Sequence, residues 1–387
     1  MTALAMRLYY FAFFANVGII IPYLPLYFQS LGMTPIQIGV LTSITPLGRP
    51  FFAGAWTVPA ERTNRRHAAL VLASWLSAGA YALYLFPSTF TGLVLVTLAV
   101  GATQAPVHAF AEATVLDASR TRRIDYGRIR VWGSLGFVVS SAILGWILDA
   151  VPVRSMLYAI VGCAVLVAAA CLILPRPLAH AKHGRSSLRG FLRRPGVVAF
   201  YSAAMLMQAS HGAYYTFYTI HMSQQGHLSR TIGMLWGLGV VSEMVIMVLF
   251  SRFSRMLKPS RLLELCFLLA AVRWGAYSLS ASLWVAIPAQ VLHAFSFGAF
   301  HMAAVTATQR IFPDDIRASG QAVYSGTTFG LGTVAGAVAA GALFDVIGPF
   351  GLFGVSALIA LAGAALIARA TGRIEGFDAR DAAGAGV

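Results

Sequence analysis

The chain has 387 residues, of which 58% are hydrophobic and only 11% are charged, and its formal net charge is +15. Soluble domains carry about 25% charged residues, so this composition excludes a water-soluble protein and leaves no stretch polar enough for a separate soluble domain. Apolar windows of about 20 residues, enough to cross roughly 30 Å of hydrocarbon, recur along almost the whole chain. They predict an all-α, polytopic membrane protein embedded in a lipid bilayer.

Twelve apolar segments follow one another and are predicted to be transmembrane helices. The first begins at Arg7 and is too long for the apolar region of a signal peptide, so we retain it as a membrane helix. In chain order the twelve lie near residues 7–29, 35–57, 67–86, 90–116, 126–148, 154–174, 196–222, 230–251, 261–280, 283–311, 318–344 and 348–369.

Basic residues gather in every second loop between these segments. They are Arg62, Arg65 and Arg66; Arg120, Arg122 and Arg123; several between Arg176 and Arg194; and Arg252, Arg255 and Lys258. The intervening loops hold only Arg154 and Arg230. This asymmetry follows the positive-inside rule and predicts that both termini and the 175–195 loop are cytoplasmic, in a bacterial inner membrane. The positive charge therefore reflects topology, and nucleic acid is not expected as a partner.

Motifs for enzyme chemistry are missing from the sequence. Cys163, Cys171 and Cys266 lie inside apolar runs, as packing residues do, and imply no disulfide. No P-loop, metal-ligand spacing or nucleophile elbow occurs. We therefore expect neither an enzyme nor a bound metal or cofactor.

The second half of the sequence repeats the first in the same order. Glycines recur 194 residues later, and the segment "GAYAL" at 79–83 returns as "GAYSL" at 275–279. The repeated glycines are Gly18, Gly32 and Gly39, which return as Gly212, Gly226 and Gly233. The repeat predicts parallel six-helix bundles at 1–174 and 196–371, a basic linker at 175–195 and a short tail at 372–387. This architecture is typical of transporters that bind solute between the halves near the midplane. A duplicated membrane enzyme or receptor is the alternative.

Several motifs carry a family resemblance. The loop "ERTNRR" at 61–66 resembles the acidic-Arg-x-Gly-Arg-Arg loop of the major facilitator superfamily, with Asn64 where glycine is usual. Within that superfamily the chain is similar to the lactose permease group and the related phenylpropionate permease type. The motifs are "GIIIPYLPLYF" (18–28), "YGRIRVWGSLGF" (126–137), "SEMVIM" (242–247), "VRWGAYS" (272–278) and "VLHAF" (291–295). The resemblance implies the superfamily fold of twelve helices around a central cavity, and a gating loop containing Glu61, Arg62, Arg65 and Arg66.

The resemblance also implies roles for individual residues. Arg130 matches the arginine that holds substrate in lactose permease, and Glu243 matches the glutamate of its sugar site. Arg273 and His293 match members of its proton-coupling group.

Three departures limit this transfer. Ser296 stands where the coupling glutamate is expected, Gln290 replaces a lysine, and His108 replaces the acid that partners the substrate arginine. Loss of these groups favours the phenylpropionate permease side of the family over lactose-like sugars.

Charged residues within the apolar segments need a reason to be there, because a charge in a bilayer is costly. Arg128 is expected at the membrane interface, and Arg130 is expected in the central cavity or in a structural ion pair. Glu243 stands alone in its segment, so it must be protonated or paired, and it is the predicted proton carrier. The repeat maps Glu243 onto Arg49, which becomes a further cavity candidate. Arg273 is predicted to pair with Glu243 or with an acidic solute.

Two polar stripes strengthen the prediction of a cavity. Gln104, His108 and Glu112 share one helix face, and so do His293, Phe297 and His301. A gate salt bridge is the alternative role for Glu112. For the histidines, the alternative is a packing role inside the protein. We assign solute contacts to Arg130, Glu243, Arg49, Phe137, His108, Gln104, Tyr214 and Tyr218, and proton coupling to Glu243, His293, Arg273 and Glu112. For the aromatic residues, anchoring at the lipid interface is the alternative.

The intramembrane charges suggest the kind of solute. The apolar segments contain three arginines, at 49, 130 and 273, and two glutamates, at 112 and 243. This leaves an excess positive charge that a carboxylate would balance. We therefore expect a monomeric, cofactor-free proton symporter of a small organic solute, an aromatic or other carboxylate. Alternatives are a symporter of a neutral sugar or nucleoside, a drug-efflux antiporter, and a transporter-like membrane sensor.

Overall fold

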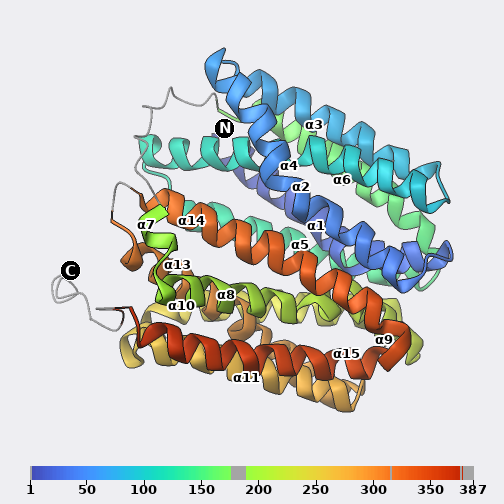
Figure 1. Cartoon of the computed structure of the whole chain (residues 1–387). Coiled ribbons are helices and arrows are strands. Elements are labelled where there is room, and N and C mark those ends of the chain that lie inside the picture. The colour runs from blue at the N-terminus through green and yellow to red at the C-terminus, as the bar shows by residue number, and fades with distance from the viewer. Residues whose placement is uncertain (1, 176–188, 314–315, 375–376, 378–387) are drawn as a thin grey trace.

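The computed structural model describes residues 2–175, 189–313, 316–374 and 377, and the described residues form helices and no strands (Figure 1). The first half contains α1 (Thr2–Ser30), α2 (Pro35–Arg62), α3 (Arg66–Ala82), η1 (Leu83–Leu85), α4 (Phe90–Arg122), α5 (Tyr126–Leu148), η2 (Val153–Ser155) and α6 (Met156–Ile173). The second half contains α7 (Arg189–Leu192), α8 (Pro195–Ser210), α9 (Gly212–Gln224), α10 (Ser229–Met256), α11 (Pro259–Leu279), α12 (Leu283–Val291), η3 (Ala294–Ala299), α13 (Phe300–Ile311), α14 (Arg317–Ser325), η4 (Gly326–Gly332) and α15 (Thr333–Thr371). The predicted all-α membrane architecture is confirmed. Most of the predicted 175–195 linker and of the tail after 372 lies outside the described residues.

Nine helical segments within the described residues are long and apolar enough to cross a membrane, judged by length and composition. The other predicted spans have identifiable irregularities. The helix α2 carries Arg49 and three internal prolines. The seventh predicted span divides at His211 into α8 and α9, each too short to count alone. The last two form one run, Arg317–Thr371, which is broken by Gly348 at φ 68°, just before Pro349.

The ends of α2 show why this helix begins and ends where it does. At its start, the Thr34 hydroxyl accepts a hydrogen bond from the Gln37 N–H, and the Gln37 side chain accepts one from the Thr34 N–H. This reciprocal capping box satisfies two N–H groups that the helix leaves free. At its end, Asn64 has φ 53°, while the Arg65 N–H bonds to the Ala60 carbonyl. Such a left-handed C-terminal turn suits glycine best and asparagine next, so Asn64 can make the turn for which the resemblance implied glycine.

The repeated glycines hold equivalent structural positions. Gly32 and Gly226 both have positive φ, at 79° and 83°, in the turns after α1 and α9. A Cβ on Gly18 would lie 2.6 Å from the Phe137 carbonyl oxygen on α5, and one on Gly212 would lie 2.3 Å from the Gly336 carbonyl oxygen on α15. In each half, therefore, the absence of a side chain allows two helices to approach closely.

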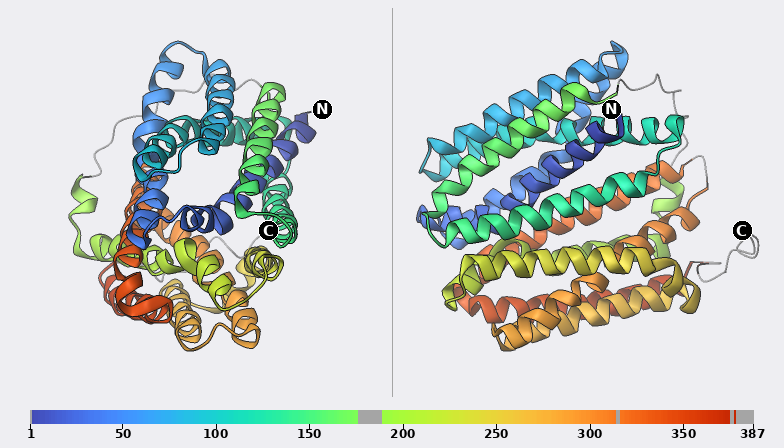
Figure 2. Two further views of the ribbon diagram at one scale, coloured as in Figure 1. Left: turned by 90° about the vertical axis from the view of Figure 1, so that its right-hand side faces the viewer. Right: turned by 180° about the vertical axis from the view of Figure 1, so that it is seen from behind.

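The two halves meet mainly along three pairs of helices. Figures 1 and 2 show the helices of the first half beside those of the second, with α5 against α10, α2 against α15 and α1 against α9. Gly39 on α2 and Gly233 on α10 make the close approaches: a Cβ there would lie 2.6 Å from the Ala337 carbonyl oxygen and 2.2 Å from that of Ser141, respectively. The start of α1 and the end of α15 lie at the same end of the bundle (Figure 2).

One end of the interface between the halves is closed by direct polar contacts. The Tyr23 hydroxyl donates to the Ser141 carbonyl at 2.8 Å and also lies 3.4 Å from the Ser229 carbonyl in the other half. Asp149 and Arg230 form an ion pair at 3.6 Å across the same junction. These residues belong to the end that carries few basic residues. Arg49, midway along α2, is by contrast exposed.

Candidate solute and proton site

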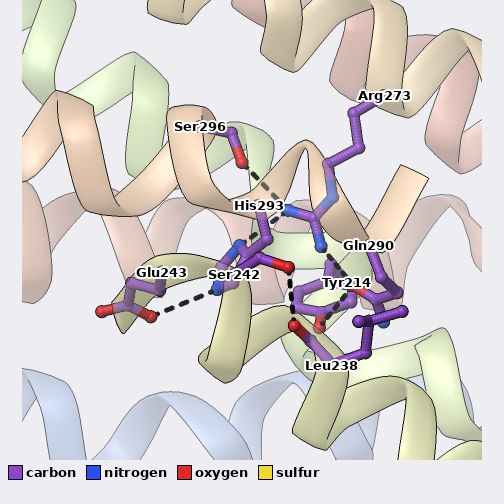
Figure 3. Close-up of polar contacts among 8 residues, drawn as sticks. All are labelled: Tyr214, Leu238, Ser242, Glu243, Arg273, Gln290, His293 and Ser296. Atoms are coloured by element: carbon purple, nitrogen blue, oxygen red, sulfur yellow. Dashed lines mark hydrogen bonds and ion pairs between the residues drawn. The ribbon is translucent and has the colours of Figure 1, made fainter. Parts of the chain in front are cut away.

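A buried guanidinium organises the polar core of the second half (Figure 3). Arg273 on α11 has no exposed surface. Its Nη1 lies 2.9 Å from His293 Nδ1 and donates to Ser296 Oγ at 3.1 Å, while Nη2 donates to Gln290 Oε1 at 2.9 Å. These three partners come from the run of α12 and η3, so one side chain ties α11 to that run.

Neutral groups alone solvate the charge of Arg273. Its guanidinium carbon lies 4.3 Å from the ring centroids of Tyr214 and Trp274, a distance at which cation–π attraction is effective. The Tyr214 hydroxyl also donates to Gln290 Oε1 at 3.2 Å. Among the described residues no carboxylate lies within ion-pair distance of Arg273. The predicted direct pair with Glu243 is therefore absent, because His293 lies between the two residues.

The bond to Arg273 fixes the proton on His293. A guanidinium only donates hydrogen bonds, so Nδ1 must accept and the proton of the neutral ring lies on Nε2. Nε2 faces Glu243 Oε2 at 3.8 Å, an electrostatic contact longer than a hydrogen bond (Figure 3). A second proton on His293 would turn Nδ1 into a donor facing another donor. Glu243, in contrast, can change its protonation without disturbing Arg273.

Glu243 has the freedom that a proton carrier needs. Its side chain is 18% exposed, so it is neither fully sealed nor fully hydrated. It lies within electrostatic reach of Arg130 in the other half. Gly298 leaves room beside it, since a Cβ at that position would come within 3.0 Å of Glu243 Cγ.

Glu112 in the first half has a different environment. Its two carboxylate oxygens accept hydrogen bonds from the Tyr10 and Tyr126 hydroxyls, which join α4 to α1 and α5. Both oxygens thus act as acceptors, the role of an ionised carboxylate. This geometry favours a structural anion, whereas we had assigned Glu112 to proton coupling.

Arg130 lies beside Tyr10, one of the two tyrosines that bind Glu112, but forms no ion pair with Glu112. Its guanidinium carbon stacks 4.2 Å from the ring centroid of Phe14 and 5.6 Å from that of Tyr10. No carboxylate lies within ion-pair distance of Arg130 in the part of the chain that the structure describes. Its neighbour Arg128, which we predict at the membrane interface, has an 83% exposed side chain and pairs with Asp125 at 3.7 Å.

Arg130 also faces groups from several helices. Besides Glu243, it lies within electrostatic reach of His108 on α4 and His301 on α13. Arg49 acts on His108 as well, so this candidate shares the same region. The His108 ring stacks on Phe13 at 4.9 Å, and its Nδ1 has no hydrogen-bond partner. Arg130 is therefore linked electrostatically to Glu243 and His108, and Arg49 is linked to His108.

Other candidates lie behind this neighbourhood. Phe137, Tyr214 and Tyr218 are buried in helix packing, and the Tyr218 hydroxyl accepts from that of Tyr277 at 3.4 Å. In this conformation they support the site and do not line it, contrary to our assignment of solute contacts. Their burial follows from aromatic packing inside each half, which the sequence alone did not separate from a cavity wall.

Gln104 lines a small cavity inside the first half. Asn16, Ser77 and Tyr81 contribute to the same cavity, and Asn16 Oδ1 is buried without a hydrogen-bond partner. The repeat places Ser77 at the position equivalent to Arg273. A guanidinium thus occupies the second half where the first half has space lined by neutral polar groups.

The predicted gating loop lies at the end of α2. Glu61 and Arg66 form an ion pair at 3.1 Å, and Arg62 and Arg65 are exposed. His211, between α8 and α9, is a buried polar residue that we did not predict: its Nδ1 bonds to the Met207 carbonyl, and its Nε2 has no partner. Its place beside Gly212 in "QASHGAYY" was the available signal. The described residues contain no group of three or more His, Cys, Asp or Glu that could hold a metal.

Comparisons with known proteins find a family model, relatives and solved structures that match this chain. The model of the MFS_1 like family matches residues 3–355. The "Probable 3-phenylpropionic acid transporter" of Escherichia coli (strain K12) is 28% identical over 363 residues, which are 91% of this chain and 93% of that protein. The "Maltose permease" of Geobacillus stearothermophilus is 26% identical over 328 residues, 84% of this chain and 83% of that one. The crystal structure of the nucleoside transporter NupG superposes with a TM-score of 0.82 at 14% identity, covering 95% of this chain and 98% of that chain.

Proposed function

The chain belongs to the MFS_1 like family, and we propose that this transporter moves one proton together with one small organic monocarboxylate. Membership makes it a multi-pass membrane transporter of small solutes and not an enzyme, and it confirms the resemblance drawn from the motifs. The coupling to a proton and the carboxylate nature of the solute are our proposal. We propose that the proton gradient drives transport without a bound cofactor.

The observation that carries the proposal is an arginine of the first half without a carboxylate partner in the described part of the chain, within electrostatic reach of a partly exposed glutamate of the second half. Arg130 has no carboxylate within ion-pair distance among the described residues, and Glu243 lies across from it within electrostatic reach. When Glu243 is charged, it partly balances Arg130. When Glu243 takes up a proton, that balance is lost, and an uncompensated charge in a low-dielectric site is costly. A solute carboxylate restores the balance, and arginine offers it a forked, charge-assisted contact.

This arrangement makes binding of the two ligands interdependent. Protonation of Glu243 frees Arg130 for the anion, and the bound anion in turn favours the neutral form of Glu243. Coupling free energies of this kind are reciprocal. The fixed cation Arg273 supports the scheme, because its ligands are neutral and do not compete for the proton.

The closed end of the interface bears on the conformational state of this structure. With the basic loops on the cytoplasmic side of a bacterial inner membrane, Tyr23, Asp149 and Arg230 close the outer end. We propose that the closed end is the outer one and that both termini are cytoplasmic. We propose that a monomer suffices, since both walls of the site come from one chain.

Uptake into proteoliposomes tests this function. Purified protein in vesicles with an acidic exterior is expected to accumulate radiolabelled 3-phenylpropionate above its external concentration, and a protonophore should release it. A neutral solute such as maltose or uridine should neither accumulate nor compete. Accumulation of a neutral solute without any carboxylate uptake would favour the sugar or nucleoside alternative. Proton-driven expulsion of solute would favour efflux, and binding without movement would favour a sensor.

A further inference from the structure

Two short π-helical segments of the second half meet through one pair of aromatic rings. They are η3 (Ala294–Ala299) and η4 (Gly326–Gly332), and each interrupts a long helical run. Phe297 from the first and Phe329 from the second are in ring contact, with centroids 6.0 Å apart. Isolated π-helical turns occur frequently at functional sites, so this pair of interruptions calls for a role.

His301 completes an aromatic face with these two rings. Its ring stacks on Phe297 at 6.1 Å with an interplanar angle of 19°, and it meets Phe329 edge-on at 5.5 Å. Tyr324 is buried behind it, and the Tyr324 hydroxyl bonds to His301 Nδ1 at 3.1 Å, which sets the orientation of the imidazole. We call Phe297, His301 and Phe329 the aromatic face. All three are partly exposed, whereas the rings that fill the core nearby are buried.

The aromatic face is electrostatically connected to Arg130 of the first half. His301 is within electrostatic reach of Arg130, as is Glu243. Phe297 also stacks against His293 at 5.5 Å, which links the face to the Arg273 network. A cation of the first half and an aromatic surface of the second half thus lie within electrostatic reach of each other.

We propose that the aromatic face binds the ring of an aromatic monocarboxylate whose carboxylate pairs with Arg130. This inference rests on the proposed function and names the substrate class. Aromatic rings prefer offset-stacked or edge-to-face contacts at centroid distances of about 4.5–7 Å, and the mixed orientations of the face offer both. The solute would then connect the two halves, carboxylate to the first and ring to the second.

Paired uptake assays with two solutes separate ring recognition from carboxylate recognition. The probes are 3-phenylpropionate and hexanoate, which share a carboxylate and differ in the ring. The doubly substituted chain Phe297→Leu, Phe329→Leu is expected to raise the KM for 3-phenylpropionate roughly ten-fold, as loss of aromatic pairing implies, and to leave the KM for hexanoate unchanged. The matched control is Phe295→Leu, on the same π-helical segment but packed against Phe253 at 6.1 Å, and it should alter neither value.

The inference is overturned if the doubly substituted chain keeps the preference for 3-phenylpropionate. It is also overturned if the KM rises equally for both solutes, which is the result of a purely structural role. Competition on the unaltered protein keeps the test independent of folding: 3-phenylpropionate must inhibit hexanoate uptake at lower concentration than hexanoate inhibits its own. Equal potency of the two acids rejects the aromatic face and leaves the proposed function standing. Failure to transport either acid rejects the proposed function itself.

Discussion

Replacing Glu243 with glutamine is expected to abolish accumulation of solute against its gradient. Glutamine has nearly the shape of protonated glutamate, so solute should still bind, but it cannot release a proton on the other side of the membrane. The measurement is pH-driven uptake into proteoliposomes, accompanied by a thermal-shift assay for binding of 3-phenylpropionate. Accumulation should fall to the level of protein-free vesicles, while the shift in Tm caused by the ligand persists and no longer depends on pH.

Two comparisons make this result specific. Glu264→Gln, which only breaks an ion pair with Arg261 at 2.8 Å on α11, is the matched control and should accumulate solute normally. Glu112→Gln should also retain coupling, because Glu112 is held by two tyrosine hydroxyls as a structural anion. If Glu243→Gln still accumulates solute in response to an imposed pH gradient, the proton carrier is another residue.

Replacing Arg130 with lysine is expected to weaken solute binding despite the conserved charge. Lysine presents a compact ammonium in place of the planar fork of arginine, and it loses the flat contact with Phe14 at 4.2 Å. Loss of one charge-assisted hydrogen bond costs about 2 kcal/mol, or roughly 30-fold in Kd. Equilibrium binding of labelled 3-phenylpropionate to purified protein measures the change.

The chain supplies a close control for Arg130. Arg128 lies two residues earlier, with an exposed side chain that pairs with Asp125, and Arg128→Lys should leave Kd unchanged. Wild-type binding and uptake by Arg130→Lys, at normal expression, would remove Arg130 from the solute site.

The sequence predicted the helices well because apolar length is a local property. A segment such as 126–148 coincides with α5 (Tyr126–Leu148), and the break between 344 and 348 coincides with Gly348. The division of the seventh span at His211 was missed, since no proline marks it. The two π-helical segments were also missed, because their widened turns depend on contacts between helices and not on local composition.

For the site, the sequence identified charged residues but not their partners. Arg130 and Glu243 were found because a charge inside an apolar run needs a reason. Tyr10, one of the two tyrosines that hold Glu112, is 102 residues away in the chain, so no local pattern could associate them. Likewise, the neutral ligands of Arg273 at 290, 293 and 296 lie on one face of a neighbouring run, and the sequence suggested a carboxylate partner instead. Phe137 and Tyr218 were assigned to solute contacts but are buried. The sequence could not show this, because packing inside each half is set by the fold.

The central claim is that a monoanion and a proton cross together, and the charge moved per cycle tests it most directly. One proton and one monocarboxylate carry no net charge, whereas a proton with a neutral solute carries +1, worth about 2.3 kcal/mol per 100 mV. The measurement is the initial rate of 3-phenylpropionate uptake in proteoliposomes at equal internal and external pH, with a potassium diffusion potential, negative inside, set by valinomycin. The account predicts no effect of this potential and a strong stimulation by a pH gradient in clamped vesicles. Uptake driven by the potential alone would contradict it.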